Sequence, residues 1–241
     1  MNILNRKAIK EEAKVIISGS KWLKMFLACL PATILPGVIT IVVTFILAIM
    51  QSDEQSGSAS GGGIGGLVNL LFIPFTVAIA GYFLNHIRQN NPEWTSLYKE
   101  GMDNYGKYLG VGFITNLVIA LWSLLFVFPG IYASYKYFFV HHIIHDNPNL
   151  TAKQARVLSD KMTDGFKMDL FILGLSFMPW AILTALTFGL ANLYVVPYMN
   201  TVIAMYYENL KHNAITKGIA RAEDFGYIPL AEAPVEVTVE Q

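Results

Sequence analysis

The sequence has few charged residues and a single cysteine. Only 14% of its 241 residues are charged and 54% are hydrophobic, whereas about a quarter of the residues in an ordinary soluble domain are charged. This composition argues against a water-soluble protein. The one cysteine, Cys29, excludes a disulfide framework and a CxxC redox or zinc motif, and we interpret it as a small buried apolar residue. The 17 basic and 17 acidic residues balance, so the charge predicts no nucleic-acid partner.

The sequence also lacks the motifs that indicate an enzyme. It contains no H-E-x-x-H, G-x-S-x-G or P-loop pattern, and no pair of carboxylates within an apolar run. Gly61, Gly63 and Gly66 spell G-x-G-x-x-G, but no strand precedes them and the surrounding segment is rich in serine and glycine. We therefore expect no catalytic residues, no bound cofactor and no enzymatic activity.

Long uncharged runs are the main feature that is present. A bilayer core about 30 Å thick requires about 20 mostly apolar residues of helix. Proline and glycine divide the two later runs at Phe128-Pro129-Gly130 and at Phe188-Gly189, and further prolines predict kinks within spans. The sequence thus predicts an all-α, polytopic membrane helical bundle. Its six transmembrane helices are expected near residues 25–50, 66–87, 108–128, 131–146, 169–188 and 191–210.

The basic residues lie on one side of the predicted spans. All but one of the 17 lysines and arginines precede the first span, follow the sixth, or lie in the loops after the second and fourth. Because lysine and arginine mark the cytoplasmic side, both termini are expected there. We expect a single integral membrane domain over residues 1–212. Residues 213–241 are polar and predict a disordered cytoplasmic tail.

Three segments on the predicted cytoplasmic side have helical apolar stripes. Thr151 and Gln154 form a capping box, after which apolar residues recur at helical spacing through Phe166. This pattern indicates an amphipathic helix on the membrane surface. Similar stripes cover residues 94–105 and 9–16, and each is followed by two predicted spans. The chain is therefore interpreted as three repeated units of a surface helix plus a transmembrane hairpin, with chance similarity as the alternative.

One cluster contains residue types that bind metals. His141 and His145 are four residues apart on a helix, as are His142 and Asp146, so each pair could face one cation. His86 is predicted at the same depth and would be a third ligand. The alternative is that these side chains lie in the head-group zone without a metal. We favour this alternative because neither pair has an independently identified third ligand.

Lys136 is the one basic residue predicted inside a span. A charge there is costly unless it reaches the surface, finds a partner or meets water, and no carboxylate is predicted at a matching depth. Two interpretations remain open: the ammonium group extends to the outer surface, or Lys136 lines a polar cavity. In the second case Tyr132, Tyr135, Asn116 and Asn192 are candidates for the other polar groups.

Several short motifs occur in order along the chain. They are Ile9-Lys10-Glu11-Glu12-Ala13-Lys14 with Gly19 and Trp22, Pro129-Gly130-Ile131, Asp146-Asn147-Pro148, Ser159 with Met162, Gly165 and Lys167, Leu175-Ser176-Phe177 with Trp180, Thr187 with Gly189, and Val196-Pro197-Tyr198 with Thr201, Tyr206 and Tyr207. Together they resemble a family of bacterial integral membrane proteins known as domain of unknown function 975. The resemblance implies a multi-pass protein of the bacterial cytoplasmic membrane and implies no catalytic residues. The chain departs from the family at Lys136, because a lysine commonly follows the Pro-Gly-Ile turn more closely.

Two functions stay open at this point. The surface helices and the lack of catalytic motifs favour a non-catalytic membrane protein that binds membrane lipids, a protein partner or a second copy of itself. The proline-broken spans and Lys136 would instead fit a permease for a small solute or an ion.

Overall fold

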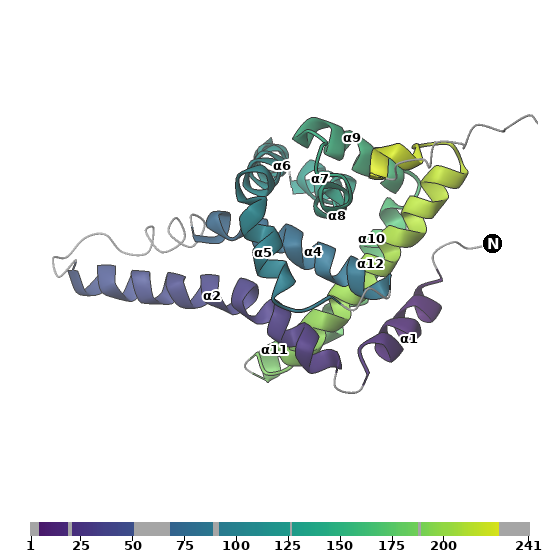
Figure 1. The fold of residues 1–241 in the computed structure, drawn as a ribbon. Helices are drawn as coiled ribbons and strands as arrows, with labels where there is room; N and C mark the ends of the chain where they lie inside the picture. The colour runs from purple at the N-terminus through teal and green to yellow at the C-terminus, as the bar shows by residue number, and fades with distance from the viewer. Residues whose placement is uncertain are drawn as a thin grey trace, which may run out of the picture.

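The computed structural model describes residues 5–18, 21–50, 68–88, 92–125, 127–187 and 189–226. Within these ranges the chain is helical and contains no β-strand, which confirms the all-α class (Figure 1). The helices are α1 (Arg6–Ile16), α2 (Lys21–Met50), α4 (Ile73–Ile87), α5 (Ser96–Asp103), α6 (Tyr105–Leu125), α7 (Val127–Lys136), α8 (Val140–Asp146), α9 (Ala152–Thr163), α10 (Lys167–Leu175), α11 (Met178–Leu186) and α12 (Asn192–Thr216), followed by the 3-10 helix η1 (Ala222–Phe225).

Two segments of the described chain are long and apolar enough to cross a membrane. They are Tyr105–Leu124 in α6 and Lys167–Leu186, which joins α10 and α11 across a short turn. The other predicted spans differ in form, since α4 has 15 residues and the predicted span 131–146 is divided between α7 and α8. Six continuous membrane helices are therefore not shown by these elements.

The turn between α7 and α8 is held by a side chain from α9. The Phe139 N–H donates a hydrogen bond to Ser159 Oγ at 3.3 Å, and the Ser159 hydroxyl donates to the carbonyl of Lys136 at 2.9 Å. Ser159 is completely buried. Because one hydroxyl satisfies both an amide and a carbonyl at the break, the helix is interrupted without leaving these buried groups unpaired. This break has no local sign in the sequence, since Ser159 lies 20 residues beyond Phe139.

The break predicted at Phe188-Gly189 occurs, whereas the one predicted at Phe128-Pro129-Gly130 lies a few residues earlier in the chain. α6 ends at Leu125 and α7 begins at Val127, so Pro129 lies in the first turn of α7, where proline is tolerated. Gly189 has a φ of +90°, a left-handed conformation that separates α11 from α12. Pro74 and Pro179 occupy the first turns of α4 and α11, so they begin helices and do not kink them.

The surface helices pack as the predicted repeat requires. α5 packs on α4, α9 on α8, and α1 on α12, so each surface helix contacts the last helix of a hairpin. The first helices follow the same circular order, because α6 packs on α4, α10 on α7, and α2 on α12. These contacts connect the three predicted segments in a closed ring.

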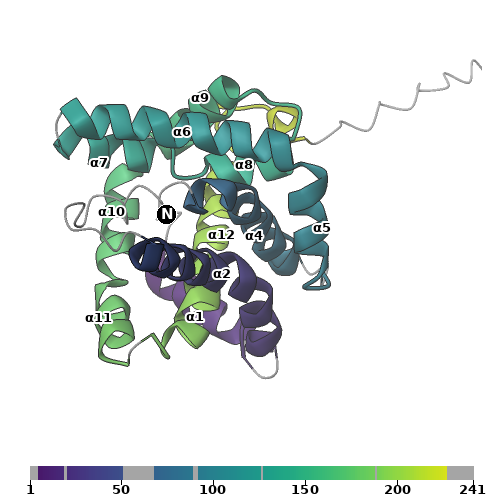
Figure 2. The same ribbon diagram turned by 90° about the vertical axis from the view of Figure 1, so that its left-hand side faces the viewer.

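The first helices of the three units point in different directions. α2 lies across the view in Figure 1 and points towards the viewer in Figure 2, where α6 lies across the top and α10 and α11 descend at one edge. The predicted spans gave no information on these directions.

The surface helices also test the predicted stripes. In α9 the Thr151–Gln154 capping box is present, and Ala155, Leu158 and Met162 are buried as predicted. The stripe predicted over residues 94–105 was expected to bury Trp94, Leu97 or Tyr98, Met102 and Tyr105. It is partly wrong, because Leu97 is buried but Trp94 and Met102 are exposed.

The predicted start of the tail at residue 213 is too early. α12 continues to Thr216, and η1 packs Phe225 against the ring of Tyr207 with 6.5 Å between centroids. The Asn147 side-chain amide donates to the carbonyls of Glu223 and Asp224 at 3.3 Å. The tail was predicted from the overall polar composition of residues 213–241, and that composition does not reveal the single apolar side chain of Phe225 as a packing residue. Residues 227–241 of the predicted tail lie outside the described residues.

Candidate functional site

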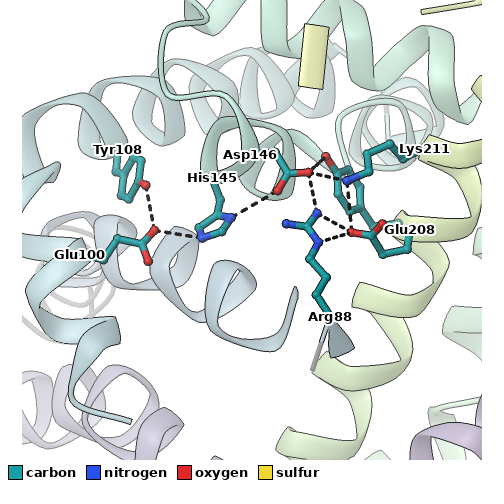
Figure 3. A network of polar contacts seen from close by, with 8 residues as sticks. Arg88, Glu100, Tyr108, His145, Asp146, Glu208 and Lys211 are labelled. Atoms are coloured by element: carbon teal, nitrogen blue, oxygen red, sulfur yellow. Dashed lines mark hydrogen bonds and ion pairs between the residues drawn. The ribbon is translucent and has the colours of Figure 1, made fainter. Parts of the chain in front are cut away.

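A buried group of charged residues joins the ends of several helices (Figure 3). We call it the ionic cluster. Arg88 follows α4, Asp146 ends α8, and both Glu208 and Lys211 lie in the second half of α12. The other members are Glu100 of α5, His145 of α8, and two tyrosines, Tyr108 and Tyr207.

Asp146 is the centre of the ionic cluster. Its side chain is only 3% exposed, and its Oδ2 accepts hydrogen bonds from Arg88 Nη2 at 2.8 Å, Lys211 Nζ at 2.8 Å and Tyr207 Oη at 2.9 Å. Hydrogen bonds between ionised groups are stronger than neutral ones. Because three donors stabilise the carboxylate form, Asp146 is a weak candidate for a general base.

Arg88 connects Asp146 to Glu208. Its Nε donates to Glu208 Oε1 at 2.9 Å, and Lys211 Nζ reaches the same oxygen at 3.2 Å. Burial opposes the charge of the guanidinium, but the hydrogen bonds and negative charges of Asp146 and Glu208 outweigh it and raise the pKa of Arg88 above its usual value. Arg88 therefore stays cationic and holds α8 and α12 at the end of α4.

His145 extends the ionic cluster towards α5. Its Nε2 lies 3.3 Å from Glu100 Oε1, and its Nδ1 lies 3.5 Å from Asp146 Oδ1. Tyr108 of α6 donates to the same Glu100 oxygen at 3.0 Å. An imidazole whose two nitrogens both face carboxylate oxygens is favoured as the cation. The three carboxylates are then matched by three cations, and the ionic cluster is neutral overall.

The close approach of α8 to α4 depends on a glycine. A Cβ added at Gly81 would overlap the imidazole ring of His145. Gly81 is therefore the position that lets His145 lie flat against α4 while it contacts Glu100 and Asp146.

The predicted metal ligands do not assemble. His145 and Asp146 belong to the ionic cluster, whereas the ring of His142 packs on Phe139 and Tyr207, with centroids 5.6 and 5.2 Å away. His86 lines a different cavity. Among the residues that the structure describes, no three histidine, cysteine, aspartate or glutamate side chains gather as a metal-binding group.

His141 also fails to join a second ligand. It is a partly buried residue whose Nε2 is buried and has no hydrogen-bond partner within the described part of the chain. Helical spacing placed His141 and His145 on one face, but the partners of His145 turn its ring towards α5 and α4.

Lys136 makes a contact that neither of its two interpretations predicted. Its Nζ lies 2.9 Å from Asp160 Oδ2 on α9, the predicted surface helix. The prediction treated residues 131–146 as one continuous span and so placed no carboxylate near Lys136. Because α7 ends at Lys136, its side chain lies beside α9 instead.

The other four residues of the predicted polar cavity make different contacts. Tyr132 accepts a hydrogen bond from Lys167 Nζ at 3.0 Å, and Tyr135 contacts the rings of Phe138 and Phe171. Asn116 is exposed on α6, and Asn192 accepts a hydrogen bond from Thr184 at 3.2 Å. Tyr132 is linked to Lys136 through Lys167 and Asp160, because the Asp160 carboxylate lies 2.9 Å from Lys136 Nζ and 3.4 Å from Lys167 Nζ.

The sequence contains one signal for the ionic cluster. Arg88, Asp146 and Lys211 lie at or just beyond the predicted ends of the second, fourth and sixth spans. Alternate spans end on the same side of a membrane, so charged residues at those three ends are expected to lie near one another. Arg88 and Lys211 are positively charged and Asp146 is negatively charged, so they can form ion pairs.

The described helices and two outward-facing apolar segments define an all-helical protein with helices suited to a membrane. Residues 124–214 match the model of the family described as protein of unknown function (DUF975). The resemblance expected from the sequence is thus confirmed over this stretch, which contains Asp146, Glu208, Lys211 and the Lys136–Asp160 pair. The match covers less than half of the chain. No curated protein and no solved structure matches.

Proposed function

We propose that the chain is a multi-pass integral protein of the bacterial cytoplasmic membrane that binds membrane lipids or a protein partner and catalyses no reaction. Its six crossing segments are α2, α4 with the residues before it, α6, α7 with α8, α10 with α11, and α12. Both termini and the ionic cluster lie on the cytoplasmic side. Residues 1–212 form one membrane domain, to which residues 213–226 add a packed extension.

The observation that carries this proposal is the exposure of the two apolar candidate spans. Only 22% of the apolar window in Tyr105–Leu124 and 17% of that in Lys167–Leu186 is buried inside the protein. The core helix of a soluble protein is instead mostly buried. Leu124 is 85% exposed and Leu186 is 74% exposed. Large contiguous apolar surfaces are unfavourable in water, so these faces fit a lipid environment.

α2 adds a third outward apolar surface. It contains 30 residues, which correspond to about 45 Å of helix, and its charged residues lie in its first turn. Its exposed side chains beyond that turn include Leu35, Val38, Ile41, Val42, Phe45 and Ile46. A helix of this length and surface is suited to cross a bilayer core about 30 Å thick.

The ionic cluster supports the proposed orientation. Arg88, Asp146 and Lys211 come together although each follows or ends a different predicted span. Segments that cross a membrane and return bring such ends to one side, and the surrounding segments carry the basic residues typical of the cytoplasm. Lys136 pairs with Asp160, so it is not the unpaired intramembrane charge that, together with the proline-broken spans, suggested a permease.

Carbonate extraction and reporter fusions test this proposal. The full chain is expected to stay in the membrane pellet after alkaline carbonate washing. A reporter inserted after Ser58 should be active only outside the cell, and one fused after Gly226 only in the cytoplasm. Release of the chain by carbonate would overturn membrane integration, and an external reporter after Gly226 would overturn the six-span topology.

A further inference from the structure

A cavity of about 480 Å³ lies where three segments meet at the proposed cytoplasmic side. We call it the α2 cavity. Its walls come from the first turn of α2, the end of α4, and the segment before α5. The lining residues are Lys21, Lys24, Tyr82, His86, Pro92, Glu93, Trp94 and Thr95.

The lining of the α2 cavity has more positive than negative charge. Lys21 and Lys24 are one helical turn apart, are both exposed, and make no ion pair within the part of the chain that the structure describes. Glu93 is the one carboxylate among the described lining residues, and its Oε2 accepts a hydrogen bond from Thr95 at 3.4 Å. His86 adds a buried Nδ1 that has no hydrogen-bond partner in the described residues. The α2 cavity is therefore suited to an anion.

One wall of the α2 cavity is fixed against α2. The Tyr98 hydroxyl donates a hydrogen bond to the carbonyl of Ala28 at 2.6 Å, and the rings of Tyr98 and Trp94 meet edge to face with 6.3 Å between centroids. Burial raises the pKa of Tyr98 to about 12, so its phenol remains a donor at neutral pH. Because this wall is already held in place, less side-chain entropy is lost when a ligand binds.

Exposed apolar side chains lie close to the α2 cavity along the chain. Leu23 and Leu27 are exposed in the first two turns of α2, which also contain Lys21 and Lys24, and Trp94 is exposed at the cavity itself. Tryptophan is common at the level of lipid head groups. A ligand with an anionic head and apolar chains matches both parts of this surface, whereas a free phosphate would use only the first.

We propose that the α2 cavity binds the phosphate head group of an anionic phospholipid, with Lys21 and Lys24 on the phosphate and the acyl chains along Leu23 and Leu27. This site rests on the proposed membrane location. It names the lipid class and the residues that would make the chain selective for anionic lipid.

The test compares two matched double variants of the full chain. Lys21→Gln with Lys24→Gln removes two positive charges from the α2 cavity. Lys99→Gln with Lys107→Gln removes two from exposed positions outside its lining. Each protein, purified in a neutral detergent, is titrated with phosphatidylglycerol or phosphatidylcholine, and bound lipid is counted by native mass spectrometry. We expect the cavity variant to bind phosphatidylglycerol roughly thirtyfold more weakly, and the other pair to match the unmodified chain.

Three outcomes would contradict the site. They are equal binding of the two lipids by the unmodified chain, equal loss in both double variants, and displacement of phosphatidylglycerol by inorganic phosphate alone, which would assign the α2 cavity to a free anion. Failure of the proposed function is seen separately, as release from membranes by carbonate. A chain that stays in the membrane but binds phosphatidylglycerol equally with and without Lys21 and Lys24 contradicts only the lipid site.

Discussion

At the scale of single residues, Asp146 explains why the ends of α4, α8 and α12 stay together. A carboxylate that is 3% exposed loses nearly all of its hydration, and only its ionised partners compensate for that loss. Arg88 lies at the end of α4 and Lys211 lies in α12. Because both contact the Asp146 carboxylate of α8, these contacts hold the three helices in place. The ionic cluster thus acts as a structural clamp.

Removing one member of this clamp should be costly. Lys211→Met keeps the length of the side chain but removes a cation that is 3% exposed and lies 2.8 Å from Asp146 Oδ2. We expect the free energy of unfolding to fall by about 3 kcal/mol, because a buried charge then loses a partner. Thermal unfolding in detergent measures the change. Lys217→Met removes an exposed lysine and should leave the midpoint unchanged; equal midpoints for both variants would contradict the clamp.

The glycine beside His145 gives a second prediction. Alanine in place of glycine within a helix normally stabilises it by about 1 kcal/mol. Gly110→Ala should do so, since nothing lies within 4 Å of the added Cβ. Gly81→Ala should instead lower stability by about 1 to 3 kcal/mol, because its Cβ overlaps the His145 ring. Opposite shifts in the unfolding midpoint are the expected result, and a stabilising Gly81→Ala would show that α8 does not pack there.

Residue contacts could be predicted from the sequence only where they are local. The capping box of Thr151 and Gln154 was predictable because both residues belong to one helical turn. The three donors to Asp146 Oδ2 are 58 to 65 residues away along the chain, so the sequence indicates at most that such charges share one side of the membrane and does not specify the pairs. Lys136 was misplaced for the same reason, since Asp160 lies on another helix.

At the scale of helices, α9 determines where the neighbouring helix is broken. Ser159 is the one α9 side chain that bonds to both sides of the break between α7 and α8 in the described structure. Proline and glycine mark breaks in the sequence itself, so the boundaries after α6 and after α11 could be predicted. A break stabilised by a distant hydroxyl leaves no such mark, and the segment 131–146 was therefore predicted as one span.

Ser159→Ala tests this role of α9. The substitution leaves the Phe139 N–H and the Lys136 carbonyl without their shared partner, and we expect a loss of about 2 kcal/mol in stability. Ser134→Ala is the matched control, because the Ser134 hydroxyl bonds only to the carbonyl of Gly130 in its own helix. Hydrogen exchange at residues 137–139 should increase in the first variant alone. Unchanged exchange there would show that another group holds the turn.

At the scale of the whole molecule, the three units close into a ring because α1 packs on α12. The sequence predicted the units from their surface helices, but it could not predict the directions of α2, α6 and α10 with α11, which follow from contacts between units. Hydropathy measures how apolar a segment is and contains no information on its angle to other segments.

The ring predicts that α1 stabilises the molecule although it crosses no membrane. Ile9 is buried on α1, whereas Glu12 is exposed on the same helix. Ile9→Ala should lower the free energy of unfolding by about 2 to 4 kcal/mol, while Glu12→Ala should change it little. Both variants should remain in the membrane fraction. If Ile9→Ala unfolds at the same temperature as the unmodified chain, α1 is not part of the ring.

The contact of α1 and α2 with α12 also sets an order of events during synthesis. Roughly 180 residues separate α1 from α12, and ribosomes add about 5 to 20 residues per second, so the first helices wait on the order of 10 to 40 seconds for their partner. Through that interval α2 lacks its α12 neighbour. The last long helix to emerge therefore completes the folding of the first, and a nascent chain arrested before residue 192 keeps that surface open to insertion factors and proteases.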